Sequence, residues 1–133
     1  MIQCKRAYEP AALGDGYRVL VDGLWPRGLK KTGLAHDAWR RELAPSKALR
    51  QALHRGEVDF AGFRERYRQA LAAHPEHWWD LAARAAEGPV TLLYAARDEA
   101  RNNARVLAEW LEEEVERRAD GSSPVCYAGE RGP

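Results

Sequence analysis

The chain has 133 residues, 45% of them hydrophobic and 31% charged, a composition typical of one soluble globular domain with its own core. Its 21 basic and 20 acidic side chains leave a net charge of +1, which excludes the general attraction to nucleic acid of a strongly basic domain. No apolar run approaches the roughly 18 to 20 residues of a membrane span, and the N-terminus lacks a signal-peptide core, so we expect a cytoplasmic protein.

Two strands are predicted near the N-terminus. Residues 2–8 alternate in polarity, and residues 17–22 form the β-branched, apolar run of a buried strand. Residues 9–16, with one proline and two glycines, are predicted to be a loop. Residues 23–33 carry three glycines and a proline, which predicts a structured loop and not a helix.

The middle of the chain is predicted to be helical, with helices over residues 37–43, 47–54, 59–73 and 75–87. The first is short and presents Trp39. Ser46 and Asp59 are suited to cap the second and third, and Pro75 fits the first position of the fourth.

A third strand is predicted at residues 90–94, whose continuous apolar character indicates burial on both faces. Asp98 is then expected to cap a long helix that runs to about Arg118. Residues 1–118 would form the folded domain. Residues 119–133, with three glycines and little periodicity, would form a flexible tail.

These elements predict an α/β fold: a small, mainly parallel sheet of about three strands, with helices packed around it in a single domain. The long helical connection between residues 17–22 and 90–94 is a crossover, and such connections join parallel strands. The carboxyl ends of the two strands then open on the same edge, where open α/β sheets bind ligands. We therefore expect a site where the segments after Asp22 and Tyr94 meet.

The first wall of this site is the loop after residue 22. Asp22 either orients a ligand or, as we favour, bonds nearby backbone amides. Arg27, between Pro26 and Gly28, is placed to hold a carboxylate or phosphate bidentately, or else forms a structural salt bridge. Trp25 either stacks on a planar ligand or belongs to the core.

The second wall is the start of the long helix. Arg97 and Arg101 beside its first-turn amides suit an anion, although the carboxylate of Asp98 would compete for those amides. Asn102 and Asn103 are poor helix formers that either brace the neighbouring loop, which we favour, or contact a ligand. The predicted ligand-binding residues are Asp22, Trp25, Arg27, Gly28, Tyr94, Arg97, Asp98, Arg101, Asn102 and Asn103.

Other reactive side chains give weaker signals. His54 is either an acid or base of the cleft or, as we favour, a helix-ending residue. The spacing of His74 and His77 is a weak metal signal, so no metal site is predicted, and no motif indicates a cofactor. Cys4 and Cys126 are expected to be free thiols, with a disulfide between them the less favoured alternative.

Several motifs occur together along the chain: RVLVD at residues 18–22, LWPRGL at 24–29, ELAPS at 42–46, VTLLYAA at 90–96 and NNA at 102–104. In this combination they resemble the YeaO-like branch of the domain-of-unknown-function 488 family, over about residues 2 to 112. The resemblance implies a small α/β protein with no established activity to carry over. It also implies a pocket between the two strand-end segments, with Arg27 as its cation.

Two positions depart from the pattern of that family. Gly23 stands where the family usually has an arginine, and Arg101 stands where it usually has a histidine. Either the cation has moved within the pocket, or the chemistry of the pocket has drifted, which counts against a histidine-based mechanism.

Three functional hypotheses follow. The first is a site for a small anionic ligand, and whether it is enzymatic stays open. The second is a non-catalytic interaction or regulatory module that contacts protein or nucleic acid. The third is purely structural, with Asp22, Arg27 and Asp98 as a buried ion-pair network. Five tryptophans in so short a chain predict at least one exposed indole and, more weakly, a homodimer contact.

Overall fold

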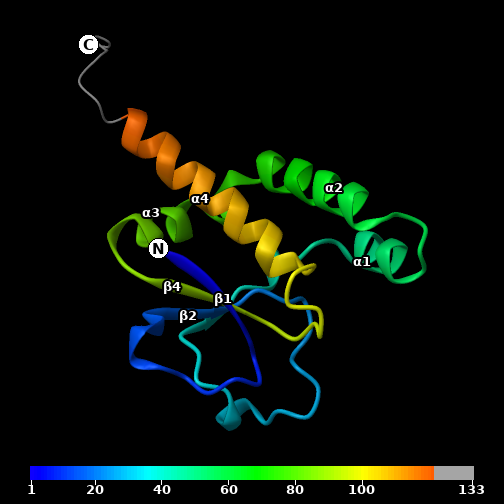
Figure 1. Cartoon of the computed structure of the whole chain (residues 1–133), viewed down its shortest axis with the longest axis horizontal. Coiled ribbons are helices and arrows are strands. Elements are labelled where there is room, and N and C mark those ends of the chain that lie inside the picture. The colour runs from blue at the N-terminus through cyan, green and yellow to red at the C-terminus, as the bar shows by residue number, and fades with distance from the viewer. Residues whose placement is uncertain (122–133) are drawn as a thin grey trace.

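The centre of the sheet is strand β4 (Val90–Tyr94), whose five residues are all buried. The computed structural model describes residues 1–121, in which β4 pairs with β1 (Ile2–Arg6) on one side and β2 (Tyr17–Leu20) on the other. All pairings are parallel, and the strand order is β1-β4-β2-β3. The predicted α/β class, parallel sheet and three strands are confirmed, and the carboxyl ends of β2 and β4 share one edge (Figure 1).

The fourth strand, β3 (Ala38–Trp39), lies where a short helix was predicted over residues 37–43. That prediction was wrong, because the free edge of β2 accepts the amides of this segment. The backbone N–H of Asp37 donates to the carbonyl of Arg18 at 2.7 Å, and that of Arg40 donates to the carbonyl of Leu20 at 2.9 Å. A 3-10 turn at Arg41–Leu43 is all that remains of the predicted helix.

Two of the predicted helix caps are present. Helix α1 (Lys47–His54) begins at Ser46, whose hydroxyl accepts a hydrogen bond from the N–H of Leu49. Helix α2 (Phe60–Ala73) begins at Asp59, which accepts from Gly62. The fourth predicted helix is divided into a 3-10 turn, Pro75–His77, and helix α3 (Trp79–Glu87).

The last helix, α4 (Asn103–Gly121), begins five residues later than Asp98, the predicted cap. Asn102 takes that role instead, because its Oδ1 accepts the N–H of Arg105 at 3.0 Å. Further along, the carboxylate of Glu112 accepts the N–H of Ile2 at the outer edge of β1. Residues 119–121 of the predicted tail belong to α4, and the rest of the tail, with Cys126, lies outside the described residues.

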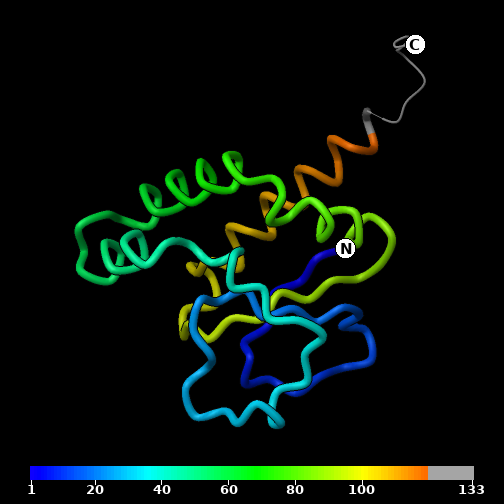
Figure 2. The backbone as a smooth tube through the Cα atoms, turned by 180° about the vertical axis from the view of Figure 1, so that it is seen from behind, coloured from blue at the N-terminus to red at the C-terminus, as the bar shows by residue number. Residues whose placement is uncertain are grey.

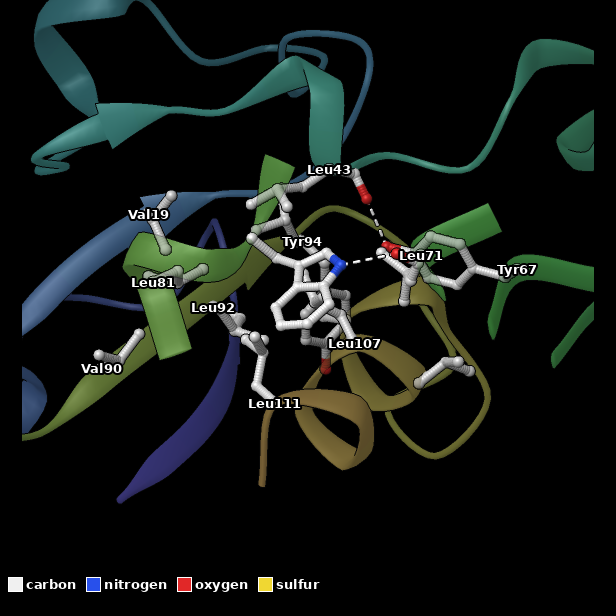
Figure 3. Close-up of a cluster of buried hydrophobic side chains, with 14 of the residues drawn as sticks. Val19, Leu43, Tyr67, Leu71, Leu81, Val90, Leu92, Tyr94, Leu107 and Leu111 are labelled. Carbon is white, nitrogen blue, oxygen red and sulfur yellow. Dashed lines mark hydrogen bonds between the residues drawn. The ribbon is translucent and has the colours of Figure 1, made fainter. Parts of the chain in front are cut away.

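Within residues 1–121, helices α1 to α4 lie on one side of the sheet, while loops lie on the other (Figures 1 and 2). Under the helices, side chains of β2 and β4 form the main core with α3 and α4, as Figure 3 shows. It contains Val19, Leu81, Leu92, Tyr94, Leu107 and Leu111, each with at most 1% of its surface exposed. No helix within residues 1–121 is long and apolar enough to span a bilayer.

The opposite face carries a smaller core and a buried ion-pair network. Leu20 and Leu93 pack there against Leu34 from the loop that follows β2. Nearer the start of the strands, the carboxylate of Asp15 bonds with Lys5 and Arg18. Burial by itself would raise the pKa of Asp15, but bonds from the Ala12 N–H and from the two cations hold that pKa below its usual value.

The prediction of at least one exposed indole is also confirmed. Trp79 is 56% exposed, whereas its neighbour Trp78 is buried in the core. Cys4 packs against the main core, and burial raises the pKa of its thiol to about 11, with Arg105 opposing the shift. Such a thiol is protonated and unreactive at neutral pH.

Replacing Leu92 by Ala is expected to destabilise the protein by about 2–5 kcal/mol, because it opens a cavity at the centre of the sheet. Leu13→Ala removes the same atoms from a side chain that is fully exposed, and it serves as the control. Urea unfolding measures both. Equal losses in the two variants would show that β4 is not in the main core.

Candidate functional site

A pocket of about 720 Å³ lies at the carboxyl edge of the sheet. Its walls come from the ends of β1 and β4, the loop after β2, helix α1 and the start of α4. The residues that line it are Arg6, Tyr8, Asp22, Gly23, Leu24, Trp25, Pro26, Arg27, Arg50, Ala95, Arg97 and Asn103. The parallel arrangement of β2 and β4 thus brings the two predicted walls together.

Asp22 joins these two walls. Its Oδ2 accepts the N–H of Ala95 at 2.9 Å, and its Oδ1 accepts the side-chain amide of Asn103 at 3.1 Å. These bonds match the favoured interpretations of both residues, since Asp22 binds backbone and Asn103 braces the neighbouring loop. Burial raises the pKa of Asp22, and the bonds from Ala95 and Asn103, with the charge of Arg50, offset only part of that effect.

Among the described residues, the pocket lining is strongly cationic, with four arginines and one carboxylate, that of Asp22. Arg6 has a structural role, because its guanidinium donates to the carbonyls of Ala95 and Ala96 at 3.1 and 3.0 Å. The guanidinium groups of Arg27 and Arg97 are exposed and have no partner within residues 1–121.

Arg50 reaches the pocket from helix α1. Its Nε is shielded from solvent and has no hydrogen-bond partner among the described residues. Its Nη2 lies 3.6 Å from where a Cβ at position 23 would be, so this guanidinium lies beside the loop after β2. A buried donor without an acceptor is uncommon, and an incoming anion would supply one.

Trp25 is part of the smaller core as well as of the pocket wall. Its ring meets His36 and Trp39 edge to face at 5.4 Å, and its Nε1 donates to the carbonyl of Leu29. Its position therefore agrees with the core interpretation, with one part of the indole left facing the pocket.

Five of the ten predicted ligand-binding residues line the pocket: Asp22, Trp25, Arg27, Arg97 and Asn103. The other five, Gly28, Tyr94, Asp98, Arg101 and Asn102, lie outside its lining, as does His54 at the exposed end of α1. Tyr94 points into the core. The carboxylate of Asp98 accepts the N–H groups of Ala100 and Arg101, and so forms a turn before the helix.

Three polar lining residues were missed: Arg6, Tyr8 and Arg50. Arg6 ends β1 and Tyr8 follows it. Strand β1 is a third parallel strand whose carboxyl end opens on the same edge, so the rule applied to the other strands would have found both residues. Arg50 lies inside a helix of the long crossover, and no local pattern in the sequence indicates which way that helix faces.

Comparison with known proteins agrees with the motifs. A family model described as "Inactive DUF488-N3 subclade" matches residues 1–128. The chain belongs to this family. The "Uncharacterized protein YeaO" of Escherichia coli K12 is 54% identical over 110 residues, which cover 83% of this chain and 96% of that protein. Two mycobacterial members, Mb3100c of Mycobacterium bovis and Rv3073c of Mycobacterium tuberculosis, are each 38% identical over 112 residues, or 83% of this chain and 92% of theirs.

No solved structure matches the chain significantly. The pocket of this DUF488 member is therefore described from its own structure alone.

Replacing Arg50 by Gln is expected to raise the pKa of Asp22 further, because the charge of Arg50 now opposes the effect of burial. The folded state would then hold its proton more tightly than the unfolded state. The free energy of unfolding should consequently fall more steeply as pH rises from the usual 3.8 to the raised value. Carboxyl ¹³C NMR titration measures the shift.

The control for this titration is Arg55→Gln, which removes a charge that is exposed and outside the pocket. An Asp22 pKa that stays the same or falls in the Arg50 variant would contradict the proximity of these two groups.

Proposed function

We propose that this protein binds a small anionic ligand, with phosphate or carboxylate groups, in the pocket at the carboxyl edge of the sheet, and that it does not transform that ligand. The observation that carries the proposal is the excess of arginine in the pocket, where Arg27, Arg50 and Arg97 have no acidic partner in hydrogen-bond contact within residues 1–121. Guanidinium groups bind such anions bidentately. The volume also falls within the range of small-molecule sites.

The donor set favours binding over catalysis. Among the described residues that line the pocket there is no histidine, cysteine, serine, threonine, lysine or glutamate. The two groups that could move a proton already bond with the protein. Asp22 accepts from Ala95 and Asn103, and the hydroxyl of Tyr8 donates to the carbonyl of Arg27. The description of the family as inactive supports the same conclusion.

The structural hypothesis receives less support than the binding hypothesis. Neither Asp22 nor Asp98 forms an ion pair with Arg27 in the described part of the chain, and a cavity adjoins Asp22.

A nucleic-acid surface is also less favoured, because arginines of the long helices are already paired. Arg64 and Arg68 of α2 bond to Glu109 and Glu113 of α4 at 2.8 and 2.7 Å. These contacts hold the two helices together and leave fewer free cations on that face.

The test is a thermal-shift screen of phosphate- and carboxylate-bearing compounds, followed by calorimetric titration of those that stabilise the protein. Arg27→Gln and Arg50→Gln are each expected to weaken binding by about 10- to 100-fold, since a hydrogen bond to a charged group contributes about 1.5–3 kcal/mol. Arg55→Gln should bind as the unmodified protein does.

Three results would contradict the proposal. One is a panel with no stabilising anion. Another is equal affinity in the pocket variants and the control. The third is a bound compound that mass spectrometry finds chemically altered after incubation, which would overturn the non-catalytic part and leave the binding part intact.

A further inference from the structure

A second group of side chains with ligand chemistry lies outside the pocket, on the turn between α2 and α3. His74, Glu76 and His77 are partly exposed there, and none of them lines the pocket. One donor atom from each of the three lies within 4.8 Å of the other two. Two imidazoles and a carboxylate are ligands that zinc and neighbouring transition metals favour.

The local backbone explains why the two imidazoles face the same way. His74 precedes Pro75, which disfavours helical geometry at residue 74 and ends α2 at Ala73. The following turn is a 3-10 helix, in which side chains three residues apart eclipse each other. The rings of His74 and His77 are accordingly stacked, with centroids 4.9 Å apart and planes 12° from parallel.

The carboxylate completes a convergent set. Oε2 of Glu76 lies 3.0 Å from Nδ1 of His74 and 3.8 Å from Nε2 of His77. In a tetrahedral zinc site with bonds of about 2.0–2.2 Å, ligand atoms stand about 3.3–3.6 Å apart. The observed separations lie on either side of that value. The side chains are partly exposed, so rotation of the two nearly parallel imidazole rings would let a nitrogen of each point toward one ion beside the carboxylate.

We propose that His74, Glu76 and His77 form a binding site for a divalent transition-metal ion, with Zn²⁺ as the best match, in which a fourth position stays open to water or a further ligand. Two neutral imidazoles and one carboxylate supply the three protein ligands. The site is independent of the anion pocket, since the two share no residue.

The neighbouring charges do not block this site. Arg40 donates to the backbone carbonyl of His77 at 2.6 Å and also pairs with Glu42 and Asp80. Its positive charge is thus balanced by two carboxylates. Because both acids are engaged with Arg40, neither is counted among the metal ligands.

The experiment is calorimetric titration of ZnCl₂ into the full chain after treatment with a chelator. Absorption of Co²⁺ provides a second readout, because visible bands report tetrahedral coordination. We expect one saturable site. The double variant His74→Gln/His77→Gln should weaken Zn²⁺ binding at least about 30-fold. Loss of a residue that merely supports a metal ligand already costs about 10- to 100-fold in affinity, so loss of two ligands should cost no less.

His54→Gln is the matched control, because it removes another exposed histidine that lies outside the cluster. Glu76→Gln keeps both imidazoles and should also weaken binding. Because the side chain of Glu76 is 63% exposed, this substitution should leave the fold intact. Circular dichroism of each variant checks folding. The proposal is overturned if the unmodified protein shows no saturable Zn²⁺ binding, or if the double variant binds as tightly as the control.

Discussion

The carboxylate of Asp22 is the contact on which the arrangement of the site depends. It stands at the end of β2, yet both of its hydrogen bonds go to residues far along the chain, at the end of β4 and the start of α4. The backbone carbonyl of Asp22 accepts a hydrogen bond from the indole N–H of Trp39, so β3 is also bonded to this residue. If these elements separated, several polar groups that are shielded from water would lose their hydrogen-bond partners. The side chain of Asp22 therefore fixes the relative positions of the segments that line the pocket.

The two ends of the sheet use a buried carboxylate in opposite ways. Towards the amino ends of the strands, Asp15 is neutralised by Lys5 and Arg18, and its own carbonyl accepts the hydroxyl of Thr91. The buried carboxylate at that end of the sheet is therefore already paired with cations of the protein. At the carboxyl end, Asp22 accepts from neutral donors instead, and the guanidinium groups of Arg27, Arg50 and Arg97 have no acidic partner in hydrogen-bond contact among the described residues. Guanidinium groups without an acidic partner therefore gather at the edge where α/β proteins bind ligands.

Sequence patterns predicted the parts of the fold that short-range physics determines. The apolar run at 90–94 gave β4, and Ser46 and Asp59 were identified as caps because their side chains bond two or three residues ahead. The errors concern contacts between distant segments. Strand β3 forms only because β2 offers a free edge, and Arg50 joins the pocket only because the crossover folds back. Asp98 was predicted as the cap of α4, and Asn102 was not considered for that role. Both residue types cap helices well, so residue type alone does not distinguish them.

Both outer edges of the sheet are unsuited to pairing with another chain. On one side β3 offers only two residues. On the other, the outward N–H of Ile2 is already taken by Glu112 of α4, and a glutamate from the following loop, Glu9, accepts that of Arg6. Short edge strands and acidic side chains bonded to edge amides are common protection against aggregation through sheet extension. The edges of this small parallel sheet are therefore poor templates for the addition of a strand from a second molecule.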